Sequence, residues 1–448
     1  MPVYQKELNI RHEADLCVIG GGPAGVSAAV TAARMGKKVL LLEAMTALGG
    51  LGTLGLVPMF CQFTDGIHFL AGGFGWEIHE RCLKENACSP NDEEDHPHKN
   101  GSISIRCEQL KRMYDEIVLK AGVKVLFHTK VCDVIMDGNK VDMLVVAGLG
   151  APYCVKAKAY LDCTGNGIVS VLAGAEYELG DVDGSLQACT LCSSWAGVDW
   201  ETVRENGFHD LWPRNTQFIE QAYNDGVLDT LDLHLSGMWR TGEKLGGVNA
   251  GHVYGVKDTD EEEVTKALFR GRQQVAQYEQ YYKRYLKGYE NMECTGTGAL
   301  LGVRESRRIM GDYVLTREDY LNRAVFEDEI GRYNYSIDIH PPTSSKEDYR
   351  QFEKDMNMKM GVGESYGIPY RSLTVKGIQN LLVAGKCVSA DHAMQASIRV
   401  MPGCFITGQA AGCAAALTGE DGDVRAIDIK ELQRNLIKIG AFLPNFKE

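Results

Sequence analysis

The stretch CVIGGGPAG at residues 17–25 constrains the fold of this chain more than any other part of the sequence. An apolar run ends in Gly20, Gly22 and Gly25, and a helical pattern follows at once over about 23–35. In a strand–turn–helix unit, the first glycine of G-x-G-x-x-G allows the tight turn. The second lets a pyrophosphate approach the backbone, and the third lets helix and strand pack closely. The pyrophosphate then lies at the helix N-terminus, where free N–H groups favour an anion.

A second apolar strand and an acid at its end complete this unit. The strand is expected over 38–42, and Glu43 stands about 20 residues past the glycines, where a carboxylate binds ribose hydroxyls. The glycine-rich loop that follows, with Gly49 and Gly50, either lets the backbone run close to a cofactor or is simply a flexible connection. The pattern predicts a dinucleotide-binding βαβ unit, and the alternative is an ordinary βαβ unit with a glycine-rich turn.

Composition narrows the class of protein. The chain has 448 residues, enough for two or three domains, and its net charge of −13 argues against binding to a nucleic-acid backbone. No run approaches the roughly 18 apolar residues of a membrane span, and the polar N-terminus has no signal-peptide core. Fourteen cysteines without an export signal indicate reduced thiols, so we expect a cytoplasmic protein that does not act on membranes.

The middle of the chain predicts an antiparallel addition to the dinucleotide sheet. An amphipathic helix over 106–121 is followed by four β patterns, and Asp137-Gly138-Asn139 is a hairpin signal between two of them. The four expected strands are 123–128, 131–136, 140–147 and 154–161. A plain doubly wound dehydrogenase would instead continue to alternate strand and helix.

The sequence pattern of a nucleotide-binding domain ends at about residue 176 and resumes near residue 369. A strand is expected over 186–196, and a long helix begins after Thr259 with Glu262 completing a capping box. Near the C-terminus, 381–385 reads as a buried strand and 402–417 as a helix of small residues. We therefore expect an α/β fold in which 1–175 and 369–448 form one nucleotide-binding domain and 176–368 form an inserted α+β domain.

Four later segments carry a family resemblance. They read GVRESRRIMG at 302–311, IPYRSL at 368–373, NLLVAGKCVSADHA at 380–393 and SIRVMPGCFITGQAAG at 397–412. With the N-terminal fingerprint, the chain resembles the FAD-dependent oxidoreductase family related to fumarate reductase and succinate dehydrogenase flavoproteins, within the glutathione-reductase-like FAD superfamily. The resemblance implies a Rossmann-like FAD-binding domain of the glutathione-reductase type with a β meander, and an inserted substrate domain.

The resemblance also implies where FAD binds. It places the pyrophosphate on the fingerprint loop, the adenosine ribose on Glu43, adenine on the backbone of Val131, and the flavin beside the C-terminal segments. The implied cofactor residues are Gly20, Gly22, Pro23, Ala24, Gly25, Glu43, Ala44, Gly49, Gly50, Val131, Thr164, Gly165, Gly167, Gly385, Ser397, Arg399, Val400 and Met401. No histidine occurs at 44–56, where covalently flavinylated members carry one, so we expect non-covalent FAD.

Two absences limit the chemistry. The sequence has no second G-x-G-x-x-G and no C-x-x-x-x-C pair after the first unit, so we expect a diffusing electron donor or acceptor as the second partner. Cys189-x-x-Cys192 allows a redox or zinc interpretation, but it has no partner pair and lies in an apolar pattern, which favours two buried structural thiols. No metal site is predicted.

Four residues are candidates for catalysis. Arg304 lies in a dense cluster of charge, RESRR, that either faces an anionic or polar substrate or forms an internal arginine–glutamate network. Asp338 and His340 alternate in YSIDIHPP, so on a short strand they would share a face, and His340 would act as general acid or base or be a structural histidine. Arg371 and His392 lie close to the flavin by analogy with the family.

These observations predict an enzyme that moves a hydride between non-covalent FAD and a small polar organic substrate bound between the FAD-binding and inserted domains. Two alternatives remain open. One is a flavin monooxygenase, although AGKCVSAD lacks the Gly-Asp expected of hydroxylases in the C-terminal loop. The other is a non-catalytic flavin-binding redox partner or sensor. The substrate, the direction of reaction and the oligomeric state are not determined by the sequence.

Overall fold

The computed structural model describes all residues except 1, 3–4, 90–100, 208–215 and 236–237. Its larger part contains a seven-stranded sheet in the order β5-β2-β1-β8-β7-β6, with β17 added to the second half of β8. Strands β5, β2, β1, β8 and β17 are parallel, and β8, β7 and β6 form an antiparallel meander. The strands are β1 (Ile10–Ile19), β2 (Val39–Leu42), β5 (Lys124–Leu126), β6 (Lys130–Asp137), β7 (Lys140–Ala147), β8 (Tyr153–Asp162) and β17 (Leu381–Val383).

This arrangement confirms the expected α/β class with a parallel-containing, Rossmann-like sheet. The meander over 130–162 is also as predicted, whereas the strand expected at 123–128 is β5, which pairs in parallel with β2 at the edge of the sheet. The closer assignment to the glutathione-reductase type stays a prediction.

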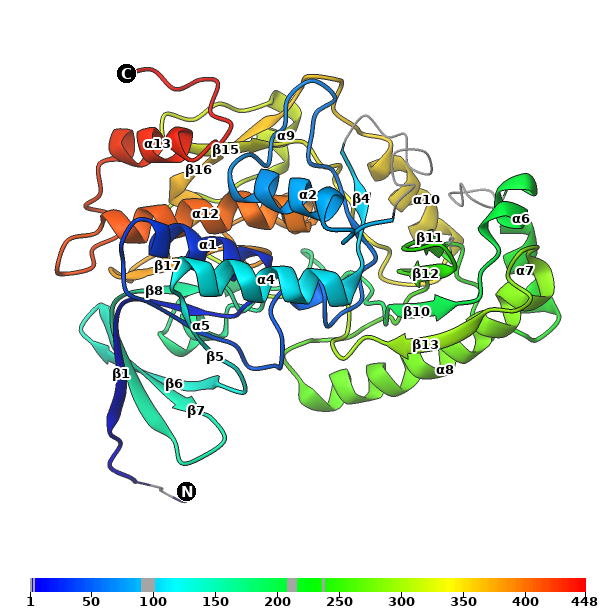
Figure 1. Ribbon diagram of the computed structural model, residues 1–448, viewed down its shortest axis with the longest axis horizontal. Helices are drawn as coiled ribbons and strands as arrows, with labels where there is room; N and C mark the ends of the chain where they lie inside the picture. The colour runs from blue at the N-terminus through cyan, green and yellow to red at the C-terminus, as the bar shows by residue number, and fades with distance from the viewer. Residues whose placement is uncertain (1, 3–4, 90–100, 208–215, 236–237) are drawn as a thin grey trace.

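Helix α1 (Pro23–Arg34) follows β1 and lies against α12 (Met401–Leu417), as Figure 1 shows. A Cβ added at Gly408 would lie 2.2 Å from the carbonyl oxygen of Ala24, and one added at Gly412 would lie 2.2 Å from that of Ala28. The glycines of the small-residue helix therefore let two backbones touch, so the C-terminal segment becomes part of the N-terminal unit. The other helices around this sheet are α2 (Phe74–Lys84), α4 (Cys107–Ala121), α5 (Ile168–Leu172) and α13 (Ile429–Lys438).

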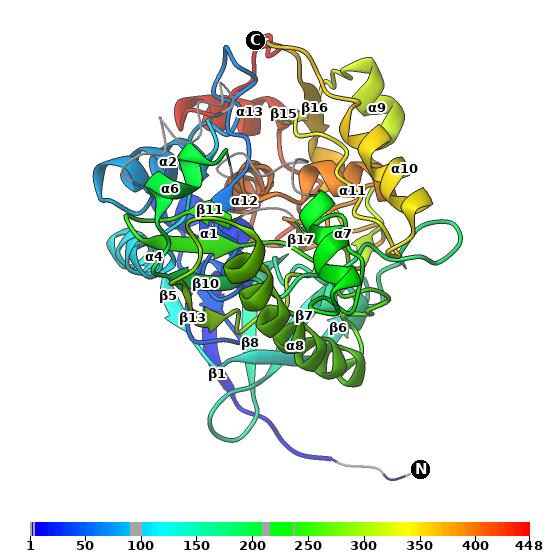
Figure 2. The ribbon, with the colours of Figure 1, turned by 90° about the vertical axis from the view of Figure 1, so that its right-hand side faces the viewer.

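The inserted part is built on a four-stranded antiparallel sheet, β11-β12-β10-β13, crossed by one long helix (Figure 2). Its elements are β10 (Ser193–Ala196), α6 (Trp200–Glu205), α7 (Thr216–Asn224), β11 (Met238–Arg240), β12 (Leu245–Val248), α8 (Glu261–Tyr285) and β13 (Glu293–Thr297). It has a separate hydrophobic core that includes Trp195, Tyr282 and Tyr289.

Between these parts lie short elements whose apolar side chains join the main core. Ile309, Ile330, Tyr333 and Tyr366 pack with the α1 and β1 residues rather than with the inserted sheet. The elements are β3 (Met59–Phe60), β4 (Ile103–Ser104), β9 (Tyr177–Glu178), β14 (Arg308–Ile309), α9 (Arg317–Asn322), β15 (Glu329–Tyr333), α10 (Lys346–Met356), β16 (Tyr366–Pro369) and α11 (His392–Ile398). The division at residues 176 and 368 stays a prediction, but the shared core shows that 309–368 packs against the nucleotide-binding part.

Three local predictions are wrong. The strand expected over 186–196 is formed only at 193–196, since its first half makes isolated bridges instead. Helix α8 begins one residue later than predicted, because the side chain of Asp260, not Thr259, accepts the N–H groups of Glu262 and Glu263. Residues 335–340 form a loop rather than a strand, so Asp338 and His340 are not brought together by strand alternation.

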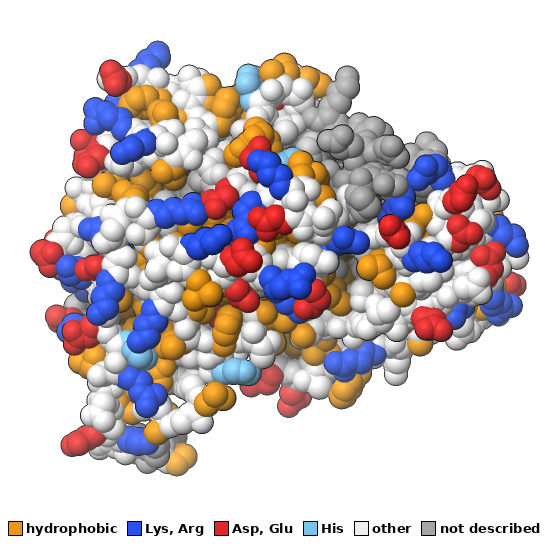
Figure 3. Space-filling view, viewed as in Figure 1, with side chains coloured by type: hydrophobic (Ala, Val, Ile, Leu, Met, Phe, Trp, Pro, Cys, Tyr) orange, Lys and Arg blue, Asp and Glu red, His pale blue; other side chains and the backbone are white. Residues whose placement is uncertain are grey.

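The surface carries both signs of charge. On the face in Figure 3, Lys and Arg lie interspersed with Asp and Glu, without a continuous basic patch on that face. Within the described residues no single helix is long and apolar enough to cross a membrane, and α11 and α12 pass such a test only as a pair bent by 92°.

Candidate functional site

Four parallel strands end at the same level, and their following loops meet at one edge of the sheet. The register pairs Ile19 with Leu42 and with Asp162, and Asp162 with Val383. The fingerprint loop, Glu43, the 163–167 loop and Gly385 therefore lie side by side. Ligands of open α/β sheets bind at this carboxyl edge. The sheet thus brings together most of the residues predicted to hold the dinucleotide, including a loop more than 350 residues from the first.

The glycines of the fingerprint take the roles expected from their spacing. Gly20 has a φ of 96°, and a Cβ there would lie 2.5 Å from the carbonyl oxygen of Cys163. A Cβ at Gly25 would lie 1.8 Å from the oxygen of Gly20, so this position tolerates no side chain. At Gly22 an added Cβ meets no protein atom within 4 Å. The open side of the loop is therefore at Gly22, where a pyrophosphate has to approach the backbone.

Glu43 is buried beside this loop, with 9% of its surface exposed. The N–H of Gly21 donates to its Oε2 at 2.6 Å, and the N–H of Met45 donates to its Oε1 at 2.7 Å. Burial raises the pKa of this carboxyl, and the backbone N–H donors partly oppose the rise. The carboxylate is thus fixed next to the glycine cradle, and its role in binding a ribose stays a prediction.

Two long helices point uncapped N-termini toward the same region. Gly22 at the start of α1 and Val400 at the start of α12 supply no side-chain cap, and neither first turn carries an acid. Free N–H groups and the helix dipole make both ends suitable for negative charge. The segment Ser397–Met401 enters α12 here, with Ser397 Oγ donating to the carbonyl oxygen of Tyr335 at 2.5 Å.

The remaining predicted cofactor residues lie on the second loop and at the rim. Asp162 organises the second loop by accepting Thr164 Oγ1 at 2.6 Å and Ser170 Oγ at 2.9 Å. Gly165, Gly167 and Gly385 all have positive φ. Ala44 and the Gly49–Gly50 turn follow Glu43, and a Cβ at Gly50 would lie 3.2 Å from the Cα of Gly22. Val131 lies buried in β6, paired with Val146.

Arg304 occupies the junction between the nucleotide-binding and inserted parts, and it is 6% exposed. Its Nη1 donates to the carbonyl oxygen of Ala188 at 2.8 Å and to Thr190 Oγ1 at 2.9 Å, and its Nη2 lies 3.4 Å from Asn249 Oδ1. All of these acceptors are neutral. Burial lowers the pKa of Arg304 to about 10, with Arg399 as the next cause. Within the described part of the chain, this buried guanidinium has no carboxylate partner.

Asp338 connects Arg399, at the start of α12, to the loop that carries His340. It accepts Arg399 Nη2 at 3.0 Å and Tyr335 Oη at 3.1 Å through Oδ2. Its Oδ1 lies 3.3 Å from His340 Nε2. Strand alternation predicted that Asp338 and His340 share a face, and the two side chains instead meet in a loop.

His340 belongs to a cluster of three buried histidines that sequence reasoning missed. His234, His252 and His340 each offer a ring nitrogen, and these atoms all lie within 4.8 Å of one another. His252 Nε2 lies 2.8 Å from His340 Nδ1, and His252 Nδ1 lies 3.1 Å from Asp232. The three histidines come from loops after α7, β12 and β15, so no spacing in the sequence relates them.

Two other charged residues of RESRR, Glu305 and Arg308, form an internal network. Glu305 accepts Arg308 Nη1 at 2.6 Å and lies 2.8 Å from His392 Nδ1 through the same oxygen, Oε1. Its other oxygen accepts the N–H of Gln187 at 3.2 Å. His392 is thus held by a buried carboxylate in this network, next to but outside the histidine cluster. The structure therefore combines the two interpretations of the sequence. Arg308 and Glu305 pair internally, whereas in the described part of the chain Arg304 has no acidic hydrogen-bond partner.

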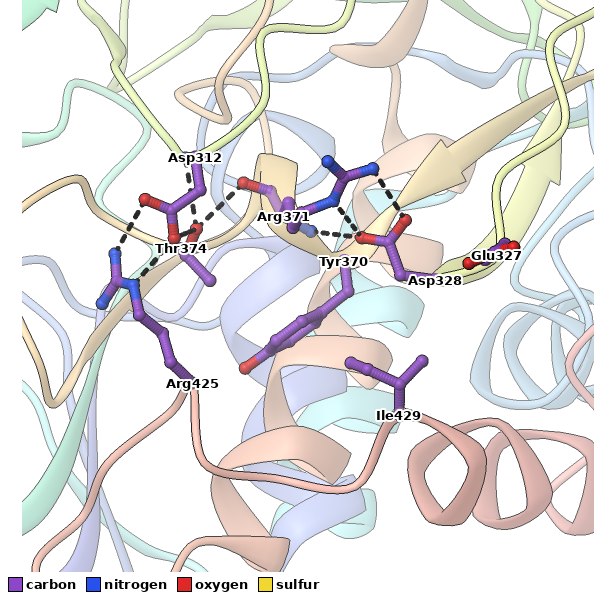
Figure 4. A pocket seen from close by; sticks show the side chains of 8 residues that line it. All are labelled: Asp312, Glu327, Asp328, Tyr370, Arg371, Thr374, Arg425 and Ile429. Carbon is purple, nitrogen blue, oxygen red and sulfur yellow. Dashed lines mark hydrogen bonds and ion pairs between the residues drawn. The ribbon is translucent and has the colours of Figure 1, made fainter.

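Arg371 lies apart from this cluster. Its side chain lines an open groove of about 400 Å³. Figure 4 shows its ion pair with Asp328, next to a second pair between Arg425 and Asp312. About half of the Arg371 side chain is exposed. The four groups neutralise one another. Among the described residues, Arg371 has no hydrogen bond or ion pair with Arg304 or His340.

Cys189 and Cys192 are both buried and unpaired, and burial raises their pKa values to about 11 and about 12. Thiols that stay protonated at neutral pH are poor nucleophiles and poor metal ligands. The interpretation of these two residues as structural thiols is therefore supported. All fourteen cysteines lie within the described residues, and all are free.

Acidification is expected to destabilise the protein through the histidine cluster. Burial lowers the pKa values of His234 and His340 well below 6.5, and neighbouring charge, from His252 and Arg304 respectively, lowers them further. Below about pH 6.5 the unfolded chain binds protons that the folded chain does not. Stability should therefore fall as the pH drops from 7 toward 5, by about 1.4 kcal/mol per pH unit for each histidine.

Urea denaturation at pH 7.5, 6.5 and 5.5 measures this dependence. The variant His234→Asn should flatten the slope, whereas His128→Asn, in an exposed loop, should not. Identical slopes in wild type and His234→Asn would contradict the assignment.

The fold and the site together define a dinucleotide-binding α/β protein with a buried, charged second site where its two parts meet. Residues 15–436 match the family described as FAD dependent oxidoreductase. The chain belongs to this family; it is an enzyme, and its cofactor is FAD.

Individual relatives match over a little more than a third of the chain. The chain is 28% identical to thiamine thiazole synthase of Pyrococcus horikoshii over 184 residues, which cover 37% of this chain and 62% of that protein. It is 29% identical to digeranylgeranylglycerophospholipid reductase 1 of Methanococcoides burtonii over 167 residues, which cover 35% and 38% respectively. The chain thus spans less than two thirds of the length of these curated relatives.

Solved structures resemble the chain over more of its length. A geranylgeranyl bacteriochlorophyll reductase-like protein from Thermoplasma acidophilum aligns with 96% of this chain and 87% of its own, with a TM-score of 0.44 and 12% identity. The flavin-dependent brominase Bmp2 aligns with 95% and 83%, with a TM-score of 0.46 and 14% identity. The expected closeness to fumarate reductase stays a prediction.

Proposed function

We propose that this enzyme moves a hydride between non-covalently bound FAD and a small organic carboxylate, which binds at Arg304 between the nucleotide-binding and inserted parts. The observation that carries the proposal is the state of Arg304. A buried charge without an opposite charge is costly, and the planar guanidinium fork matches a carboxylate in two parallel hydrogen bonds. A substrate carboxylate would supply the missing partner.

The residues that would hold FAD are those gathered at the carboxyl edge of the sheet. The Gly22 opening and the N-terminus of α1 suit the pyrophosphate, and Glu43 suits the ribose. The N-terminus of α12 suits a polar edge of the flavin ring, where its free N–H groups can stabilise negative charge. When bound, FAD supplies the hydride acceptor or donor. Arg399 directly precedes this helix and forms an ion pair with Asp338.

The substrate also exchanges a proton, and Asp338 with His340 is the pair placed to handle it. His340 Nε2 lies 3.3 Å from Asp338 Oδ1, and Asp338 is held by Arg399 and Tyr335. General acid–base groups act from within hydrogen-bond distance of the substrate. Burial excludes water from both side chains, since each is less than a tenth exposed. The second half-reaction would use a diffusing partner.

An anaerobic flavin-reduction screen tests this function. The FAD-loaded enzyme is mixed with hydroxy and amino carboxylates, and with the matching neutral alcohols and amides, while flavin absorbance is followed. The dithionite-reduced enzyme is screened with unsaturated and keto carboxylates. We expect bleaching or reoxidation by carboxylates and at least about tenfold weaker response to the neutral partners.

Other outcomes would refute the proposal. A hydroxylated product that forms only with oxygen would indicate a flavin monooxygenase. A flavin that responds to no organic compound, but exchanges electrons with a protein partner, would indicate a redox partner or sensor. A preference for neutral substrates would show that Arg304 does not bind a substrate carboxylate.

A further inference from the structure

The histidine cluster is assembled from three segments far apart in the sequence. His234 follows α7, His252 lies in a loop that bridges to Cys189 through its neighbour Val253, and His340 ends the loop after β15. All three are at most 7% exposed. The ring centroid of His234 lies 4.4 Å from that of His252 and 4.5 Å from that of His340. Three imidazoles so close to one another, and so far from water, require a reason.

The orientation of two rings is the informative feature. His252 turns Nδ1 outward to Asp232 at 3.1 Å, and His340 turns Nε2 outward to Asp338 at 3.3 Å. The other nitrogen of each ring therefore points inward, toward the partner and toward His234. Histidines that bind metal ions show this arrangement, in which a carboxylate receives the outer N–H, fixes the tautomer and leaves the inner nitrogen as a ligand.

We propose that His234, His252 and His340 bind one divalent transition-metal ion of the zinc or iron class. Three imidazole nitrogens suit these ions, whereas magnesium and calcium prefer oxygen ligands. The inward nitrogens of His252 and His340 are 2.8 Å apart, and all three ligand atoms lie within 4.8 Å. Ligands at about 2.1 Å from a common ion are separated by roughly 3 Å, so side-chain adjustments of about an ångström complete the site. The ion replaces the hydrogen bond between the two rings.

This inference goes beyond the proposed function and does not depend on it. Three ligands leave coordination positions open, as in catalytic rather than structural sites. Arg304 and Tyr254 border the cluster: charge on Arg304 acts on both His234 and His340, and Tyr254 Oη lies 3.4 Å from His252. A ligand of the ion would therefore lie close to the proposed carboxylate site. If Nδ1 of His340 binds the metal, His340 is no longer free to act as a general acid or base. Asp338 would then transfer the proton.

Metal binding to the full-length, FAD-loaded protein tests the proposal directly. Untagged protein is used in a background of Cys132→Ser, Cys294→Ser, His96→Ala and His98→Ala, which removes two exposed thiols and the histidines of the acidic segment DEEDHPH. After treatment with EDTA, Zn²⁺ is titrated calorimetrically at pH 7.5. We expect one ion per chain, and binding weaker by about a hundredfold or more in His252→Gln/His340→Gln.

The matched control is His79→Gln, a change at a partly buried histidine outside the cluster that should leave Zn²⁺ binding unchanged. FAD content and melting temperature report whether each variant folds. X-ray absorption of the Zn²⁺-loaded background protein needs no cluster variant, and it should show three imidazoles and no sulfur. The proposal is overturned if folded protein binds no Zn²⁺, if the double variant binds it equally well, or if sulfur is a ligand. In the first case the cluster is a hydrogen-bonded histidine chain between Asp232 and Asp338.

Discussion

The change Arg304→Met is expected to lower kcat/KM for carboxylate substrates by about a hundredfold to a thousandfold. Removing one partner of a buried, hydrogen-bonded charge pair typically costs 2–5 kcal/mol, and each 1.4 kcal/mol is about a factor of ten in rate. Methionine is long and apolar, so it fills much of the volume of arginine without its charge. Anaerobic stopped-flow measurements of flavin reduction at varied substrate concentration give both KM and the limiting rate.

This prediction has two controls. One variant keeps the positive charge at residue 304, and the other removes a different arginine of the same segment. Arg304→Lys should recover only part of the loss, since an ammonium cannot make the two parallel bonds of a guanidinium. Arg307→Met changes a buried arginine of the same segment that contacts the ring of Tyr177, and it should leave KM unaffected. FAD content should equal that of wild type in all three variants. An unchanged KM for carboxylates in Arg304→Met would show that the substrate binds elsewhere.

The change Gly22→Ala should weaken FAD binding by at least about tenfold while leaving the fold intact. Gly22 has a φ of −68°, which alanine adopts readily, and an added Cβ meets no protein atom within 4 Å. The methyl group would instead project into the space that the pyrophosphate needs. Titration of apoprotein with FAD, followed by flavin fluorescence, measures the affinity, and thermal denaturation of the apoprotein measures the fold.

The matched variant Gly25→Ala should behave differently. Its Cβ would lie 1.8 Å from the carbonyl oxygen of Gly20, so the loop or the start of α1 has to move. Overpacking of this kind costs about 1–3 kcal/mol or more, and we expect a lower melting temperature even without FAD. The two variants thus separate contact with the cofactor from support of the loop. Wild-type affinity in Gly22→Ala would mean that the pyrophosphate does not approach this glycine.

Most of the nucleotide-binding half could be predicted because its signals are local. The helix at 23–34 and the strand at 39–42 follow from hydrophobic period and glycine spacing, and both are found within a residue or two of the prediction. The helix at 107–121 and the hairpin at 130–147 are equally clear. Secondary-structure prediction failed for less regular stretches of the sequence. The loop at 335–340 has the alternation of a strand, but it pairs with none of the strands that the structure describes.

The second site shows the limit of the same reasoning. Arg304 and His340 were predicted as candidates, yet their significance depends on what surrounds them: neutral acceptors in one case, and two further histidines in the other. His234 and His252 carry no motif, because a histidine becomes a ligand or a base only through its neighbours. Arg371 was predicted as a candidate because it lies in the segment IPYRSL. In the folded protein its side chain instead pairs with Asp328 in an open groove.

The sequence by itself determined the strand–turn–helix–strand unit at residues 16–43 and predicted that a dinucleotide binds to residues 17–25 and Glu43. The reason is that turn geometry, helix start and strand end are set by residues within a few positions of one another. Only the tertiary structure decided that the loop before α12 meets this unit, through the glycine contacts of α12 with α1. It also decided that Arg304 is buried without an acidic hydrogen-bond partner among the described residues, and that three distant histidines converge. Burial and pairing of charge are properties of the folded surroundings, and no local pattern encodes them.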